Sequence, residues 1–309
     1  MLKKKALKKI GITSFILFVI LTIYLIPSKT KKNDVEYNYK ELQDINVYLL
    51  NDNNQLTKVD LKISNNSLEE TIKTIINKLT LSNDSTIPNG LKQLLPRNIE
   101  LLDLYIDDGI VYLNFSENLL KIQENDLQNI IEGVSYSILN LKNINGVSIY
   151  INEENISKIY NGKFPSIITG NYGINKRIEL KKFDDITKVV IFYIDNIDDK
   201  NYYVPVTKYI NDERDKIKII IDELSSNYIY ESNLITLLDK NIKLIDYSIN
   251  NELMTLNFNN SIFLGLDNIV EEVVYSISYS VFSSYEEVET LVFKVNNEKI
   301  EKKFKKDIE

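Results

Sequence analysis

The chain has 309 residues, 37 basic and 44 acidic side chains, and a formal net charge of −7. It contains no His, Cys or Trp, which excludes a histidine general base, a cysteine nucleophile and a zinc site built from His or Cys. Residues 1–32 carry eight lysines and no acid, so the remainder has 29 basic and 44 acidic residues and a charge of −15. A surface of this sign argues against nucleic-acid binding.

The N-terminus has the pattern of a membrane anchor. Five lysines in Met1–Lys9 precede the apolar run Ile10–Ile26, which ends at Pro27. At about 1.5 Å per residue this run is roughly 25 Å long, enough to cross a bilayer core as a helix. No small-residue cleavage pattern follows Ile26, so we interpret residues 1–27 as an uncleaved single-pass anchor and not as a removed signal peptide. Without cysteine, no lipid-modified Cys can replace this anchor.

The lysine distribution predicts the orientation of that anchor. Five lysines lie before the span and three after it, which favours a cytoplasmic N-terminus and C-terminal domains outside the cell membrane. Because both flanks are basic, the prediction depends on a small difference. A polar tether, residues 28–44, is expected to follow the anchor.

The first predicted domain, residues 45–162, opens with two strands and a helix. Val47–Leu50 and Leu56–Ile63 read as a β-hairpin. Ser67 and Glu70 form a capping-box pattern, and the apolar stripe that follows predicts a helix.

The second half of this domain predicts a hairpin, a helix and a closing strand. In Val111–Ser116 apolar and polar residues alternate, and Asp108-Gly109 before them is a tight-turn signal. Residues 126–141 have helical periodicity, and Val147–Ile151 reads as the last strand. The order β-β-α-β-β-α-β predicts an α+β fold in which helices cover one face of a mostly antiparallel sheet.

A predicted linker, residues 163–187, separates this domain from a second copy at 188–300, and a charged tail follows at 301–309. The copies are visible as a repeat: residues 94–116 align without a gap on 237–259, and 129–138 resemble 268–277. A period of about 140 residues is far longer than a solenoid unit, so it indicates a duplicated domain.

The repeat suggests several candidate site residues, and each has a simpler structural explanation. Asp103 and Asp246 are equivalent, as are Asn114 and Asn257; we interpret them as solvated or bonded to local backbone. Tyr136 and Tyr275 lie in the matched helices and are expected to pack with a satisfied hydroxyl. Asn89-Gly90 could hold an anion, but we interpret this dipeptide as a bend in a loop. Three acidic pairs, which are scattered along the second half, are Asp184-Asp185, Asp198-Asp199 and Glu286-Glu287.

Several stretches resemble a known family. VYLLND (47–52), GLKQLLPRNIELL (90–102), DDGIVYLNFSENL (107–119) and YSILNLKNINGVSIYIN (136–152) are similar to the GerMN domain. The whole chain resembles the GerM-type sporulation and spore-germination proteins, with two tandem GerMN domains behind an N-terminal transmembrane helix. In the second copy Asp239 replaces Pro96, Glu252 replaces Gly109, and Pro88–Gly90 has no counterpart, so that copy departs further from the pattern.

The resemblance implies a fold related to ring-building motifs and a role in endospore formation and germination. It implies no enzyme activity, no catalytic, cofactor-binding or metal-binding residues and no cofactor. The implied partners are proteins of the channel complex between mother cell and forespore, in the intermembrane space, with self-association as a second mode of contact. The membrane would be reached through Ile10–Ile26. The alternative is an extracytoplasmic cell-wall carbohydrate-binding protein or a carboxylate-based hydrolase, which predicts two convergent acids or a groove lined by stacked tyrosines.

Overall fold

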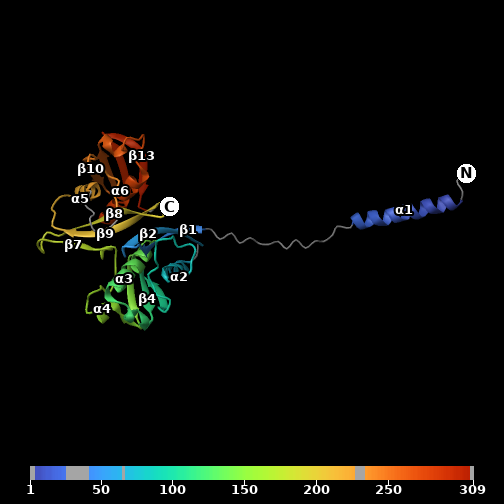
Figure 1. Cartoon of the computed structure of the whole chain (residues 1–309), viewed down its shortest axis with the longest axis horizontal. Coiled ribbons are helices and arrows are strands. Elements are labelled where there is room, and N and C mark those ends of the chain that lie inside the picture. Colours follow the sequence, from blue (N-terminus) through green and yellow to red (C-terminus); the bar gives the residue numbers. More distant parts are fainter. Residues whose placement is uncertain (1–3, 26–41, 65–66, 227–233, 307–309) are drawn as a thin grey trace. The chain divides into compact units, whose positions relative to one another are not determined.

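The computed structural model describes residues 4–25, 42–64, 67–226 and 234–306, and Figure 1 shows the chain coloured along its sequence. The chain divides into two compact units, Met1–Lys40 and Glu41–Glu309. The first unit contains the helix α1 (Lys4–Leu25), which includes most of the predicted anchor. In the described part of the chain, no helix reaches the combined length and apolarity that a bilayer crossing requires. The tether predicted for 28–44 lies largely outside the described residues.

The second unit contains both repeats. The first repeat consists of β1 (Leu42–Leu50), β2 (Leu56–Ser64), α2 (Leu68–Leu79), β3 (Leu101–Asp107), β4 (Ile110–Phe115), the 3-10 turn η1 (Glu117–Lys121), α3 (Glu124–Leu139), β5 (Gly146–Ile151), β6 (Glu154–Asn155) and α4 (Ile156–Ile159). The connection that follows contributes β7 (Arg177–Glu179). The second repeat consists of β8 (Thr187–Ile197), β9 (Lys200–Ile210), α5 (Lys216–Ser225), β10 (Leu244–Asn250), β11 (Leu253–Phe258), η2 (Asn260–Phe263), α6 (Glu271–Ser284), β12 (Thr290–Val295) and β13 (Glu298–Lys305).

The predicted local signals are confirmed. Ser67 caps α2, because its hydroxyl accepts a hydrogen bond from the Glu70 backbone N–H. Asp108 and Gly109 both have positive φ, as a tight hairpin turn between β3 and β4 requires. Asn251 takes φ +53° in the corresponding turn of the second repeat, so an asparagine there replaces the glycine. The predicted order of strands and helices is present in both copies.

The predicted sheet is wrong in two respects. The closing strand of each copy runs parallel to its neighbour, since β5 pairs with β4 and β12 with β11 in parallel register. Each connection contains a helix, α3 or α6, as parallel crossovers usually do. The opening hairpin of each copy also belongs to a different sheet from the other strands. Alternating apolar residues predict a half-buried strand but do not identify its neighbour.

The two opening hairpins form one shared sheet. Its strands are ordered β1-β2-β9-β7, and β8 pairs with β9. Lys58 of β2 pairs antiparallel with Tyr203 of β9, and Figure 1 shows these strands side by side. Because both are the second strand of their hairpin, the repeats meet through equivalent strands, as the subunits of a symmetric dimer do.

Each repeat has its own hydrophobic core between its strands and its helices. Ile72, Val111 and Val134 are fully buried in the first core, and Ile220, Leu256 and Ile277 in the second. The connection between the repeats also contributes to the first core, because Phe164 and Ile168 are fully buried there.

The match predicted between 129–138 and 268–277 is shifted by one helical turn. In α3 the Ser137 hydroxyl accepts from the Tyr48 N–H of β1 and donates to the Gly133 carbonyl. In α6 it is Ser280 that accepts from the Phe192 N–H of β8 and donates to the Ser276 carbonyl. The structure therefore pairs VSYSI (134–138) with ISYSV (277–281). A four-residue shift keeps the apolar face of a helix, which explains why both alignments look plausible in sequence.

Candidate functional site at the junction of the two repeats

The junction between β2 and β9 is completed by a side chain from the connection. Pro205 of β9 has no backbone N–H, so a regular ladder cannot form there. The Asn175 amide bridges the two strands instead: Oδ1 accepts from Leu56 N at 2.9 Å, and Nδ2 donates to Leu56 O at 2.8 Å and Pro205 O at 2.7 Å. Asn175 has φ +47°, a conformation that asparagine tolerates better than most residues.

The same connection is held by α3. Glu132 is 1 % exposed, and its Oε2 accepts from the Asn175 N–H at 2.9 Å, while Lys176 Nζ lies 3.3 Å from Oε1. One turn further along α3, the Tyr136 hydroxyl accepts from Gly173 N and donates to Gly170 O. Burial raises the pKa of Tyr136 above its ordinary value, which favours the neutral hydroxyl further. This confirms the predicted packing role of Tyr136, including its satisfied hydroxyl.

A cation–aromatic contact joins β2 to α6. Lys58 Nζ lies 3.8 Å from the ring centroid of Tyr279, and the lysine side chain is only 12 % exposed. Burial lowers the pKa of Lys58, and the nearby Asp60 opposes that change. Tyr279 also packs against Tyr203 and Tyr275, so the lysine faces an aromatic cluster of the second repeat.

Two further contacts lie where the hairpin turns approach each other. Asn51 follows β1 and Asp195 lies at the equivalent position of β8; Asn51 Nδ2 donates to Asp195 Oδ2 at 2.7 Å. The predicted bend at Asn89-Gly90 is confirmed by the positive φ of Gly90 (+78°). A Cβ on Gly90 would lie 2.4 Å from Cγ2 of Ile197, so a larger residue there would have to displace that side chain of the second repeat.

Asp103, Asp246, Asn114 and Asn257 occupy equivalent positions, as predicted, and each aspartate is paired with its asparagine across the hairpin. Asn114 Oδ1 accepts from Glu153 N, and Asn257 Oδ1 accepts from Asn297 N. Asn257 also donates to Asp246 at 2.9 Å. Asp103 fits the prediction, because it is exposed and accepts from the neighbouring Leu104 N–H. The prediction is wrong for the asparagines, since both accept from backbone 39 or 40 positions further along the chain and Asn257 is 1% exposed. Tyr275 packs in the aromatic cluster, but Tyr279, not Tyr275, is the counterpart of Tyr136.

Each of the three acidic pairs lies in a different connection of the chain. Asp198 and Asp199 form the β8–β9 turn, Asp185 pairs with Lys182 in the loop before β8, and Glu286-Glu287 follow α6. Within the described ranges, no three acidic side chains are grouped closely enough to hold a metal ion.

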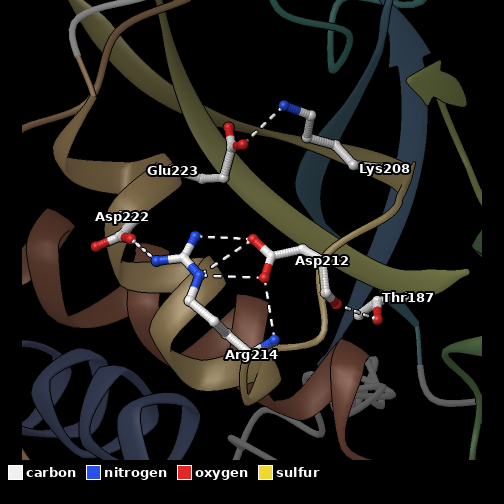
Figure 2. A network of polar contacts seen from close by, with 6 residues as sticks. All are labelled: Thr187, Lys208, Asp212, Arg214, Asp222 and Glu223. Carbon is white, nitrogen blue, oxygen red and sulfur yellow. Dashed lines mark hydrogen bonds and ion pairs between the residues drawn. The ribbon is translucent and has the colours of Figure 1, made fainter. Parts of the chain in front are cut away.

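A charged network in the second repeat stabilises the connection from β9 to α5. Figure 2 shows Arg214 between the carboxylates of Asp212 and Asp222, and Lys208 pointing to Glu223. Lys208 Nζ lies 2.8 Å from Glu223 Oε1. Arg214 lowers the pKa of Asp212 through hydrogen bonds to its carboxylate. The Thr187 hydroxyl donates to the Asp212 carbonyl, which ties the start of β8 to this connection.

Comparisons with known proteins identify the same architecture. A family model described as "Sporulation and spore germination" (Germane) matches residues 46–157 and again 190–301. The spore germination protein GerM of Bacillus subtilis (strain 168) is 30% identical over 233 residues, which cover 70% of this chain and 63% of that relative. The match therefore spans less than two thirds of the relative's length. The solved tandem GerMN domains of the Bacillus subtilis sporulation protein GerM have a TM-score of 0.73 and 25% identity, over 84% of this chain and 92% of that one.

Proposed function

Because the chain belongs to the Germane family of sporulation and spore germination proteins, we propose that it is a non-enzymatic scaffold that presents two domains in one fixed arrangement. The observation that supports this most is the junction. The connection is hydrogen-bonded to the repeats through Asn175, Glu132 and Tyr136. Strands β2 and β9 also join the two repeats in one sheet. When two binding surfaces are held in a fixed arrangement, the first contact with a partner raises the effective concentration for the second contact.

We further propose where the chain lies relative to the membrane and which proteins it contacts. The lysines before Ile10–Ile26 and the apolar run itself support a single-pass anchor with both repeats outside the cytoplasmic membrane. In this position the chain would contact proteins of the channel complex between mother cell and forespore, in the intermembrane space. Its net negative repeats suit contacts with proteins better than contacts with nucleic acid or anionic lipid.

Crosslinking in sporulating cells tests the partner. A tagged chain with a photoreactive residue near the junction is expected to capture channel-complex proteins, and the same residue on a chain that lacks 1–27 is the control. Deletion of the gene should impair spore formation or germination, and the intact gene should restore it. Normal sporulation in a clean deletion that has no second copy of the gene would contradict the proposal, as would turnover of peptidoglycan by the purified chain.

A further inference from the structure

Three tyrosines form a row across the outer face of the first repeat's second sheet. Tyr105 of β3 and Tyr112 of β4 are stacked with ring centroids 4.4 Å apart and planes 6° apart. Tyr150 of β5 follows at 6.4 Å from Tyr112. Tyr105 is 49% exposed although it is a large aromatic side chain. We call Tyr105, Tyr112 and Tyr150 the tyrosine row.

The fold does not need this row. The strand registers place Ser248, Thr255 and Lys294 of the second repeat where the first repeat has Tyr105, Tyr112 and Tyr150. The second repeat therefore forms the same sheet with small or charged side chains on this face. A feature that only one copy of a duplicated domain has is more readily explained by binding than by folding.

The surroundings of the row are hollow and acidic. A cavity of about 430 Å³, within the range of ligand pockets, is lined by the row together with Leu102, Asp103, Asn114 and Glu153 among others. Its charged lining residues are Asp103 and Glu153, and no lysine or arginine is among the described residues that line it. Aromatic faces and carboxylates both attract a cation.

The strand at the edge of this site offers room for an extended ligand. Among the described residues β3 pairs with β4 alone, and its Leu104 N–H already donates to the Asp103 carboxylate at 2.9 Å, so a further strand that pairs with this N–H would displace that side chain. Leu102, at 50% exposure, adds apolar surface beside the cavity. An extended peptide can bind at such an edge while its side chains reach the neighbouring face.

We propose that the tyrosine row binds a lysine- or arginine-bearing segment of a protein partner. This proposal rests on the proposed function, because it assumes that the ligand is a protein, and it adds the chemical class of the segment that binds. The acidic lining favours a cationic segment over a neutral cell-wall glycan, which stacked tyrosines alone would also suit.

The experiment measures binding of a fluorescent peptide of alternating arginine and threonine to the full-length chain by anisotropy. The variant is the double substitution Tyr105→Ser and Tyr112→Thr, which introduces the side chains of the second repeat and leaves the net charge unchanged. Ser248→Ala with Thr255→Ala is the matched control in the second repeat. We expect about tenfold weaker binding in the tyrosine variant and no change in the control.

Two probes separate the alternatives. Citrulline in place of arginine keeps the shape of the peptide and removes its charge, and we expect it to bind about tenfold more weakly as well. Equal binding by the tyrosine variant or by the citrulline peptide would overturn the inference. So would saturable binding of chitin oligosaccharides that the tyrosine variant loses. The single substitution Tyr105→Ser, at the sheet edge, repeats the test if the double variant fails to fold. A sporulation defect on gene deletion would still support the scaffold function if the peptide failed to bind.

Discussion

Asn51 and Asp195 occupy equivalent positions in the two repeats, and the Asn51 amide donates to the Asp195 carboxylate at 2.7 Å. The two side chains are 1% and 7% exposed, so the contact is removed from water. Asn51 Oδ1 meanwhile accepts from Asn53 N and Gln55 N, which closes the turn of its own hairpin. One residue thus orders a turn in the first repeat and fixes that turn to the second.

Replacing Asn51 should loosen this contact measurably. Asn51→Ala leaves the buried Asp195 carboxylate without its amide donor and should lower the free energy of unfolding by about 1–3 kcal/mol in denaturant titrations. Asn89→Ala, at an exposed position, should change it by less than about 0.5 kcal/mol. In a double-mutant cycle, Asp195→Ala should cost less once Asn51 is alanine. Strict additivity of the two substitutions would show that the contact contributes nothing.

The close approach of the repeats at Gly90 gives a second test. Gly90→Ala combines a strained φ of +78° with a clash against Ile197, so we expect a loss of about 2–3 kcal/mol in unfolding free energy. Gly162→Ala is the matched control, because Gly162 has φ +81° and a Cβ added there would meet no heavy atom within 4 Å, so only the strain of about 1 kcal/mol applies. Equal losses in the two variants would show that Ile197 moves away at no cost.

The elements of each repeat were predictable because their signals are local. The Ser67 cap and the alternation Val111, Leu113, Phe115 depend on neighbours in sequence, and both are confirmed. The shared sheet was not predictable, since the local sequence around Lys58 or Tyr203 does not indicate which strand pairs with it. The junction residue Asn175 was missed for the same reason: an asparagine in a glycine-rich connection predicts a turn, not a bridge between strands.

The serines of the two helices provide a direct test of the corrected alignment. Ser137 and Ser280 each accept a backbone N–H from the neighbouring strand, whereas the hydroxyls of Ser135 and Ser278 are buried with no hydrogen-bond partner among the described residues. Alanine at 137 or 280 leaves a buried N–H unpaired and should cost about 1–3 kcal/mol of unfolding free energy. Alanine at 135 or 278 should be neutral or stabilising. If Ser276→Ala lowered the unfolding free energy and Ser280→Ala did not, the original alignment of 129–138 with 268–277 would be correct.

Stability in acid should depend on Asp84. Hydrogen bonds from Lys78 and from Thr86 lower the pKa of Asp84 from 3.8 to about 2. Because the folded pKa is below the unfolded one, the ionised carboxylate stabilises the fold above about pH 4, and this contribution is lost as the pH falls towards about 2. The Asp84 side chain is 22% exposed, so solvent screening limits the contribution to about 1 kcal/mol.

The measurement compares urea unfolding of the wild type and Asp84→Asn between about pH 2 and pH 6. We expect the difference in unfolding free energy to be largest at the upper end of this range and to fall towards zero at the acid end. Asp52→Asn is the control, because its ion pair with Lys92 at 2.9 Å is largely exposed. A difference that stays constant across the range would contradict the pKa shift of Asp84.

The last prediction concerns the arrangement of the repeats. Asn175→Gly removes the amide that bridges Leu56 and Pro205 and still tolerates φ +47°, so each core should stay folded while the junction loosens. Asn161→Gly is the matched control, at an exposed asparagine with φ +50°. Because the chain has no cysteine, Lys121→Cys with Lys240→Cys gives one unique spin-label pair across the repeats. The distance distribution between the labels should broaden in Asn175→Gly and stay narrow in Asn161→Gly. If the distance distribution of Asn175→Gly is as narrow as that of the wild type, β2 and β9 hold the repeats together without Asn175. The arrangement of the scaffold would then depend on the shared sheet alone.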